Sequence, residues 1–382
     1  MTGAARPRPG NRPPGRRHIL GRCVVAALAF PLVLVLAAGC EAPPQLHQRQ
    51  LYTFGTLVEV SLWGVEADLA EQAFEALAGE FDYMNEAWHA WRPGTLGTFN
   101  ERCATGEPFE GDPGVVDLVR LGTTLSERSS GLFNPAIGRL VALWGFHADL
   151  PEPRAPPVAA IAELVAAAPA MTDIHLDDTT VRCTNTAVRL DFGAFAKGYG
   201  VDRAMERLRE LGIDDAVINA GGDLRAIGSK GERPWQIGVR HPRGPGALAR
   251  LEVAGDESVF TSGDYERHFE WQGTRYHHII DPRTGWPSRG AASATVVHGD
   301  ATTADAAATA LMVTGAGAWP AVAARLGVTE ALVITADLEI EMTPAMEQRL
   351  RLTSEPPAVR VLPLPNPRPN PRPVPRAAGP AD

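Results

Sequence analysis

A glycine-rich segment, Leu190-Asp191-Phe192-Gly193-Ala194-Phe195-Ala196-Lys197-Gly198-Tyr199-Gly200, marks the point at which the sequence pattern changes. Behind it, apolar residues at helical spacing predict a helix over 201–211, and a second helix is expected over 303–314. Helices interleaved with hairpin-like strands predict an α+β domain, with a mixed or antiparallel sheet and flanking helices, rather than a doubly wound parallel sheet. The expected strands lie near 215–219, 235–240, 249–254, 258–262, 267–271, 274–280, 292–298 and 331–335.

The residues before this segment extend the same domain toward the amino terminus. Alternation of apolar residues over 51–63 predicts a strand, and helical spacing predicts a helix over 70–84 and another that starts at Asp112-Pro113. Residues 150–170 are rich in Ala and Pro and are expected to form a surface excursion. The domain is therefore expected to cover residues 51–345.

The carboxyl-terminal residues 355–382 have a different composition. Ten of these 28 residues are proline, so the tail is expected to be extended and mobile.

Composition and charge exclude several classes of protein. The 382 residues carry a formal net charge of −9, and the six basic residues of segment 1–39 are balanced by no acid, so the remainder is more acidic still. Such an acidic body is unsuited to nucleic acid, which requires a basic face. The four cysteines show no CxxC spacing, which argues against a zinc module or a disulfide scaffold, and whether Cys103 and Cys183 pair stays open.

Residues 1–39 are expected to be a lipoprotein signal peptide. Arg16, Arg17 and Arg22 precede an apolar run over 23–38, which is shorter than a membrane span, and the run ends in Ala-Ala-Gly before Cys40. That ending is similar to the lipobox of bacterial lipoproteins, so Cys40 is the expected lipidation site, followed by a polar tether over 40–50. The alternatives are an ordinary signal peptide with an incidental cysteine and twin-arginine export through Arg16-Arg17. Each places the mature protein outside the cytoplasm; lipidation would anchor it to a bacterial membrane, on the periplasmic side or at the cell surface.

Three stretches could carry chemistry. In the first, small residues stand directly before the helix over 201–211, where a backbone can approach a ligand and a helix start favours anions. Lys197 could then meet a phosphate, although neither a Walker loop nor a GxGxxG fingerprint is present. The alternative is a structural turn with a solvated lysine.

The second stretch runs from Thr302 to Thr309. Thr302 or Thr303 could cap a helix on which residues 305, 308 and 309 share one face. A carboxylate and a hydroxyl beside alanines leave room for a hard cation such as Mg²⁺. The alternative is that Asp305 only complements the dipole of its own helix.

The third stretch runs from Tyr276 to Gly285 and contains His277 and His278. A histidine at the end of a strand could act as acid, base or phosphate contact, and adjacent residues of a strand point to opposite faces, so at most one should face a site. Two further segments, 218–223 and 259–265, place small and polar residues after a strand. A structural turn is the first interpretation of each, and a ligand-binding loop is the second.

Taken in order, these stretches resemble the FAD:protein FMN transferase family, also called the ApbE family. The resemblance covers roughly residues 51–340. Its motifs are Tyr52-Thr53-Phe54-Gly55-Thr56, Phe133-Asn134-Pro135-Ala136-Ile137-Gly138 with Leu143-Trp144-Gly145-Phe146, and the segments 191–200, 220–223, 261–265, 278–285 and 303–310. Several ordered motifs are far more specific than any one of them.

The resemblance implies a reaction and a set of site residues. FAD would be split between its phosphates, FMN would be joined by a phosphoester to a Thr or Ser of an exported acceptor protein, such as a subunit of a membrane redox complex, and AMP would leave with Mg²⁺ required. The implied metal ligands are the Ala194 carbonyl, Asp305 and Thr309, and His278 is the candidate catalytic base. The implied FAD contacts are Phe54, Trp91, Ala136, Ile137, Gly138, Asp191, Lys197 and Ile279.

Three positions depart from the family pattern. Phe54 stands where Met is common, Trp91 where Tyr is frequent, and Ala308 where some relatives have a second metal-binding Asp, so a sparser metal shell is expected. Two other functions stay open: a Mg²⁺-dependent FAD pyrophosphatase that gives FMN and AMP, and a flavin-binding lipoprotein that stores FAD without turnover.

Overall fold

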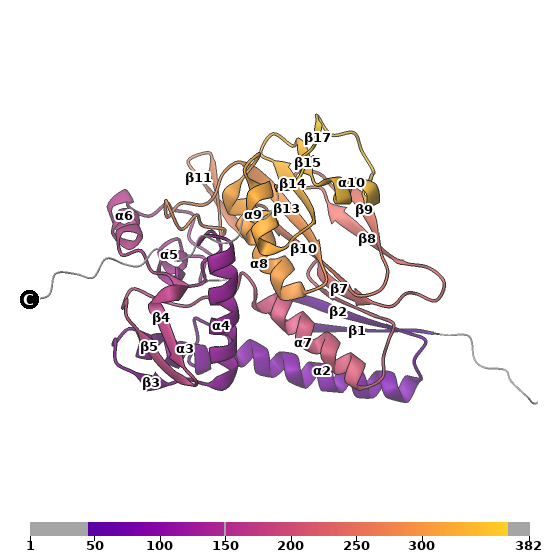
Figure 1. Cartoon of the computed structure of the whole chain (residues 1–382), viewed down its shortest axis with the longest axis horizontal. Coiled ribbons are helices and arrows are strands. Elements are labelled where there is room, and N and C mark those ends of the chain that lie inside the picture. Colours follow the sequence, from indigo (N-terminus) through magenta and orange to yellow (C-terminus); the bar gives the residue numbers. More distant parts are fainter. Residues whose placement is uncertain (1–44, 149, 366–382) are drawn as a thin grey trace, which may run out of the picture. The chain divides into compact units, whose positions relative to one another are not determined.

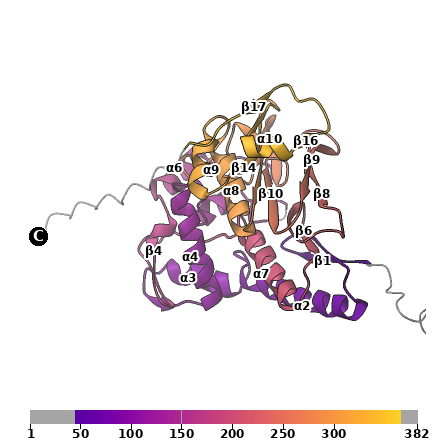
Figure 2. The same ribbon diagram turned by 45° about the vertical axis from the view of Figure 1, so that its right-hand side comes forward.

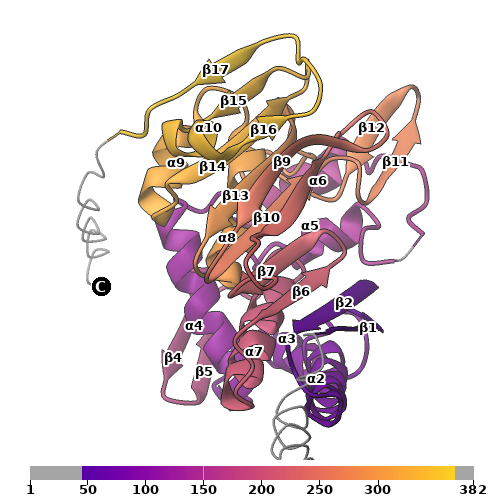
Figure 3. The ribbon, with the colours of Figure 1, turned by 90° about the vertical axis from the view of Figure 1, so that its right-hand side faces the viewer.

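The computed structural model describes residues 45–148 and 150–365, and these residues are built around one large sheet (Figure 1). Neighbouring strands are antiparallel except β15 and β17, which pair in parallel. Figure 3 shows the strands following one another from β17 at the top to β1 at the bottom. Their order is β1 (Leu46–Thr53), β2 (Thr56–Trp63), β6 (Ala216–Ala220), β7 (Asp223–Ile227), β10 (Glu257–Gly263), β13 (Ala291–His298), β14 (Glu330–Thr335), β15 (Ile340–Met342) and β17 (Val359–Val361).

Helices cover one face of this sheet. Their apolar side chains form the larger core together with side chains of the sheet such as Ile218, Phe260 and Val296. Helices α7 and α2 run side by side beneath the strands (Figure 1). The helices are α2 (Ala67–Ala87), α7 (Ala196–Glu210), α8 (Ala301–Thr314) and α9 (Trp319–Leu326), with α4 (Pro113–Arg128) packed against α9.

The opposite face of the sheet is buried as well. Val217, Val259 and Val297 each stand beside a residue of the larger core but belong to a second core, because successive strand side chains point to opposite faces. The second core is covered by β8 (Trp235–Arg240), β9 (Ala247–Val253), β16 (Arg351–Leu352) and α10 (Pro344–Arg349), on the side away from α8 (Figure 2).

Smaller units complete the described chain. The third core is built from α5 (Gly138–Leu143), α6 (Val158–Ala166) and the hairpin of β11 (His268–Trp271) and β12 (Thr274–His277). A small sheet has the order β3 (Phe109–Glu110), β5 (Thr180–Cys183) and β4 (Ile174–Asp177), the last preceded by the 3-10 turn η1 (Met171–Asp173). None of the helices within residues 45–365 is both long and apolar enough to cross a membrane.

The α+β prediction is confirmed, but the amino-terminal edge differs from expectation. The expectation of a tether over 40–50 is wrong for Leu46–Gln50, which pair with β2 as part of β1. The single strand expected over 51–63 is a hairpin that turns at Phe54-Gly55, both with positive φ. The polar side chains of β1 hide its strand character, because an edge strand is held by backbone pairing while one face stays in contact with solvent.

The carboxyl-terminal boundary also moves. Residues 344–352 continue the domain as α10 and β16, so it does not end at 345. Within the expected mobile tail, Val359–Val361 form β17, and Arg360 is ion-paired with Glu339 and with the buried Glu341. The excursion over 150–170 contains the helix α6, whose Ile161 is buried. Residues 366–382, like the signal segment and Cys40, lie outside the described residues.

The open question about the cysteines is answered. Cys103, at the end of α3 (Thr95–Cys103), and Cys183, at the end of β5, form a disulfide across 80 residues of sequence, and both are buried.

Candidate active site

The amino-terminal ends of α7 and α8 meet beneath the sheet. The Gly198 amide in the first turn of α7 donates a hydrogen bond to Asp305 Oδ2 at 3.0 Å. A Cβ at position 198 would lie 2.4 Å from the Ala301 carbonyl oxygen, so only glycine allows this approach. Asp305 therefore serves the amino-terminal end of the neighbouring helix rather than only that of its own.

The amino-terminal cap of α8 differs from the expected one. Asp300 is the N-cap, and its Oδ1 accepts the Thr303 amide hydrogen at 2.6 Å. The expectation that Thr302 or Thr303 caps the helix is wrong, because the helix begins two to three residues earlier, at Ala301.

Lys197 lies in the first turn of α7 and is paired with a carboxylate. Its ammonium forms an ion pair with Asp223, and Asp223 Oδ1 accepts the Thr261 amide hydrogen at 2.7 Å. Burial favours the neutral amine, but Asp223 and Asp305 outweigh that effect and raise the pKa of Lys197. Lys197 is thus a half-buried cation held in an ion pair, and the alternative of a solvated lysine does not describe it.

Asp305 carries charge that its surroundings compensate only in part. Burial raises its pKa to about 7, with Lys197 opposing the shift and Asp223 adding to it. On the next turn of α8, the Thr309 hydroxyl lies 3.3 Å from the Ser262 hydroxyl. A carboxylate whose charge is only partly compensated, on the same helix as a hydroxyl one turn away, offers the oxygen ligands that a hard divalent cation prefers.

Other features of this corner limit a metal shell. Ala308 is buried, and within residues 45–148 and 150–365 no three His, Cys, Asp or Glu side chains gather as a metal group. A bound cation would therefore depend on hydroxyl and carbonyl oxygens besides Asp305. The third implied ligand, Ala194, lies in the turn two residues before α7 begins.

Trp91 and Asp191, two of the implied FAD contacts, touch each other. The Trp91 indole N–H donates to Asp191 Oδ2 at 3.2 Å, while Asp191 Oδ1 accepts the Gly193 amide hydrogen at 2.8 Å. The Arg189 guanidinium lies 4.5 Å from the centre of the Trp91 ring, and the His147 ring lies 5.4 Å from it. An aromatic face framed by a cation and a carboxylate suits a planar, polar ring system.

The main chain of the segment Ala136–Gly138 is hydrogen-bonded to the main chain at Arg189. The Gly138 amide donates to the Arg189 carbonyl at 2.8 Å, and the Arg189 amide donates to the Ala136 carbonyl at 3.2 Å. Ile137 pairs with Arg189 as a parallel bridge. These residues therefore lie next to Asp191 along the chain that leads to Lys197.

The two histidines face different surroundings, as expected for neighbours at a strand end. His277 is buried, with Nε2 bonded to the Ser288 carbonyl at 2.8 Å. His278 Nδ1 lies 3.2 Å from the Arg267 carbonyl, and its ring lies 6.4 Å from Phe146. A carbonyl can only accept, so Nδ1 carries the proton and Nε2 is left as the acceptor.

The electrostatic setting of His278 keeps it neutral. Burial lowers its pKa to about 3, and the charges of His277, Arg267 and Lys197 act in the same direction. Its neighbour Ile279 is buried, and the Ile279 carbonyl accepts the Ser288 amide hydrogen at 2.9 Å, so its main chain is already engaged.

Phe54 belongs to a separate group of rings. It lies in the β1–β2 turn, stacks on Trp88 at 6.5 Å between centroids and meets Phe81 edge-on at 5.8 Å. Its ring also occupies the space beside Gly200 of α7. Phe54 thus packs against α7, the helix that also carries Lys197.

Sequence reasoning missed three residues that the structure brings to the site. Asp223 was within a quoted motif but had no role, Arg189 directly precedes the glycine-rich segment, and His147 follows the Trp144-Gly145-Phe146 run. Only the Asp223 position carried a usable signal, because a carboxylate after Gly221-Gly222 at a strand start is placed beside a tight turn.

Comparison with known proteins settles the family. A model of the ApbE family matches residues 54–333, which is well over half of the chain. This chain belongs to the ApbE family. The match includes every implied site residue named above, from Phe54 to Thr309.

Individual members of the ApbE family agree with this assignment. A Rhodobacter capsulatus protein named FAD:protein FMN transferase is 44% identical over 343 residues, which cover 88% of this chain and 66% of that longer relative. A Treponema pallidum protein of the same name is 33% identical, covering 86% of this chain and 95% of the relative. The crystal structure of the Thermotoga maritima ApbE protein superposes with a TM-score of 0.74 at 31% identity, covering 80% of this chain and 99% of that one.

Proposed function

We propose that this chain is a flavin transferase that cleaves FAD in a Mg²⁺-dependent reaction and attaches FMN to a Thr or Ser hydroxyl of an exported acceptor protein. The names of its ApbE relatives support the reaction class. The observation that carries the proposal is that α7 and α8 begin side by side, with Lys197 in the first turn of α7 and Asp305 of α8 accepting the Gly198 amide hydrogen, while Thr309 lies one turn further along α8. Charge of both signs at helix starts suits a diphosphate with a cation.

The residues around Trp91 would hold the organic part of FAD. Trp91 offers a half-buried aromatic face, Asp191 and Arg189 flank it, and the Ala136–Gly138 segment lies beside them. Lys197 would meet the diphosphate, since an ammonium paired with a carboxylate keeps its charge throughout the neutral pH range.

Asp305, Thr309 and the Ala194 carbonyl would hold Mg²⁺. The bound ion would neutralise diphosphate charge and stabilise the departing AMP. Asp305 contributes the charge and Thr309 a neutral oxygen from the next turn of the same helix.

The acceptor hydroxyl must lose a proton as its oxygen attacks the FMN phosphorus. The bond from that phosphorus to the bridging oxygen breaks, and the oxygen leaves with AMP. His278 Nε2 would take the hydroxyl proton, because the Arg267 carbonyl holds Nδ1 in the protonated form.

One assay separates this function from the two alternatives. The purified protein is incubated with FAD, Mg²⁺ and a candidate acceptor protein, and the mixture is then denatured. Flavin that stays on the denatured acceptor supports the transferase. Release of free FMN and AMP alone would indicate the FAD pyrophosphatase, and unchanged FAD bound to the protein would indicate a storage protein.

Lys197→Ala is expected to raise the KM for FAD and to lower kcat together. The ammonium meets charge that is present in the ground state and charge that develops on the leaving phosphate, so both constants should change. Steady-state kinetics over a range of FAD concentrations measure the two separately. Constants equal to those of the unaltered enzyme would remove Lys197 from the diphosphate site.

For localisation, we propose export and lipid anchoring to a bacterial membrane, on the periplasmic side or at the cell surface. A buried Cys103–Cys183 disulfide supports export, because such bonds persist in oxidising compartments. Cys40 itself lies outside the described residues.

Cys40→Ser is accordingly expected to move the protein from the membrane fraction to the soluble exported fraction. The membrane affinity of an acylated protein increases with each CH₂ group buried in the bilayer, so loss of the acylated residue removes the anchor. Immunoblots of membrane and soluble fractions make the measurement, and a mutant that still fractionates with membranes would contradict lipidation at Cys40.

A further inference from the structure

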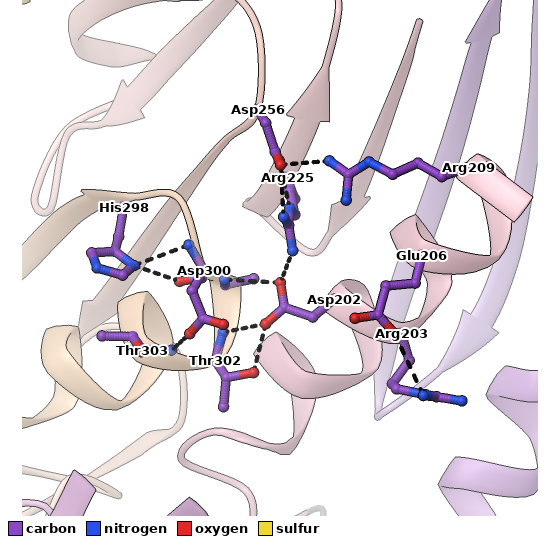
Figure 4. A network of polar contacts seen from close by, with 11 residues as sticks. Asp202, Arg203, Glu206, Arg209, Arg225, Asp256, His298, Asp300, Thr302 and Thr303 are labelled. Atoms are coloured by element: carbon purple, nitrogen blue, oxygen red, sulfur yellow. Dashed lines mark hydrogen bonds and ion pairs between the residues drawn. The ribbon is translucent and has the colours of Figure 1, made fainter. Parts of the chain in front are cut away.

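Helices α7 and α8 each contribute a carboxylate that accepts amide hydrogens from the first turn of the other helix. Asp305 of α8 accepts the Gly198 amide hydrogen of α7, as described above. In the reverse direction, Asp202 of α7 accepts the amide hydrogens of Ala301 and Thr302 at 2.9 and 2.8 Å, and the Thr302 hydroxyl at 2.6 Å (Figure 4). Each helix therefore supplies the anion that satisfies the unpaired amides of the other.

The charge on Asp202 is kept in place by a buried arginine. Arg225 on β7 forms an ion pair with Asp202, and its other nitrogens donate to Asp256 at 2.9 and 3.0 Å. Arg209, near the end of α7, closes the chain of charges by contacting Asp256 at 2.5 Å (Figure 4). Asp202 and Arg225 are both more than nine-tenths buried, whereas Asp256 is half-exposed.

This arrangement requires a carboxylate at position 202. Its two oxygens accept from two amides, one hydroxyl and one guanidinium, and all four partners are donors. An asparagine offers one accepting oxygen and turns an NH₂ group toward donors, which leaves buried groups unpaired.

The Asp202 contacts lie close to the proposed cation site along both helices. Thr302 is three residues before Asp305 on α8, and Lys197 is five residues before Asp202 on α7. A shift of the first turn of α8 against α7 therefore moves Asp305 and Thr309 relative to Lys197.

We propose that Asp202 is a positioning residue that locks the first turn of α8 onto α7 and thereby sets the Asp305 oxygens at the distance from Lys197 that cation binding requires. The inference rests on the proposed function for its cation, but the helix lock itself is a statement about this chain alone. Asp202 acts through Ala301 and Thr302 and does not contact the substrate.

The test uses Asp202→Asn in the full chain, with Glu206→Gln as the matched control. Glu206 lies one turn further along α7 and is exposed, and within the described residues its ion pair is with Arg203 at 3.4 Å, so its conversion to an amide leaves α8 untouched. Two quantities are measured well below the unfolding temperature. Calorimetry gives Mg²⁺ affinity without FAD or acceptor, and hydrogen exchange gives the protection of the Gly198 amide.

We expect Asp202→Asn to weaken Mg²⁺ binding by about tenfold or more, the lower end of the range for residues that orient metal ligands. The Gly198 amide, whose acceptor is Asp305, should exchange faster, while Glu206→Gln changes neither quantity. Unchanged Mg²⁺ affinity together with unchanged Gly198 exchange in Asp202→Asn would overturn the inference.

Thr302→Val keeps the test decisive where Asp202→Asn does not fold. It removes only the hydroxyl donor and should change both quantities in the same direction by less; no change in either quantity would again contradict the inference. The exchange measurement also separates the two proposals. If the unaltered protein binds no Mg²⁺ and Asp202→Asn still releases the Gly198 amide, the proposed function fails and the helix lock stands.

Discussion

Replacing Asp305 with asparagine is expected to lower Mg²⁺-dependent flavin transfer by about 10³-fold. Asp305 is the one implied metal ligand with a charged side chain. It accepts one amide hydrogen, from Gly198, and the charge of Lys197 offsets only part of its burial. Transfer of flavin to a denatured acceptor, followed at several Mg²⁺ concentrations, measures the loss. Thr309→Ala is the comparison, and it should weaken Mg²⁺ dependence less, because a hydroxyl contributes no net charge.

The same substitution should leave the metal-free fold stable. Asp305 has a pKa near 3.8 in the unfolded chain and about 7 in the folded protein, so the folded state holds the proton more tightly. The free energy of unfolding of the metal-free protein therefore falls as pH rises from about 4 to 7, and Asp305→Asn lacks this fall. Mg²⁺ should stabilise the unaltered protein above pH 7 and should stabilise Asp305→Asn little.

Denaturant titrations at pH 5 and pH 8, with and without Mg²⁺, test this linkage. Full transfer activity of Asp305→Asn at low Mg²⁺ would remove the residue from the metal site. Equal pH dependence of stability in both proteins would show that the Asp305 carboxylate is ionised at no cost, in contradiction to its buried environment.

His278→Ala is expected to reduce flavin transfer by about 10²–10⁴-fold, the usual contribution of a general base, while FAD still binds. Single-turnover transfer measures the chemical step, and FAD titration measures binding. His277→Ala is the matched control. It should cost about 1–3 kcal/mol of stability through loss of the buried contact with the Ser288 carbonyl, yet leave transfer nearly unchanged below the unfolding temperature.

The pH dependence of this step differs from that of an ordinary histidine. Because burial lowers the pKa of His278 to about 3, the imidazole is neutral and able to accept a proton throughout the range from pH 5 to 8. The transfer rate of the unaltered enzyme should therefore show no decline near pH 6.5 that is due to His278, and the pH profiles of the unaltered enzyme and of His278→Ala should have the same shape in this range. An inactive His277→Ala would place the base one residue earlier. If both variants stay active, Asp281 is the next residue to test.

Much of the fold was predictable from local pattern. The helical spacing over 201–211 and 303–314 appears in the structure as α7 and α8. The successive short runs appear as β6 and as β8 to β13, whereas β7 was not among the expected strands. The errors fall where local pattern is weak. Polar residues conceal β1, because an edge strand is held by main-chain pairing and needs no apolar pattern in its side chains. The three-residue strand β17 is concealed by the proline-rich sequence on both sides of it.

For the candidate site, too, local pattern identified some residues and missed others. Ordered motifs pointed to Lys197, Asp305 and His278, since each lies within a short stretch whose residue types and spacing are specific. The partners that set their chemistry come from distant segments. Asp223 reaches Lys197 from another element, Arg189 reaches Trp91 across 98 positions of sequence, and no periodic pattern connects them.

The sequence alone determined the family motifs, the alternation of helices and strands, and the residue types that the chemistry needs, because these depend on composition and on spacings of two to four residues. Tertiary structure decided which charges meet. Asp202 binds the start of a helix about 100 residues away, and Asp305 binds the start of another, since close packing at Gly198 brings two helix ends together. Helix ends carry unpaired amides wherever they lie, so only the packing of the whole chain selects the carboxylate that satisfies them.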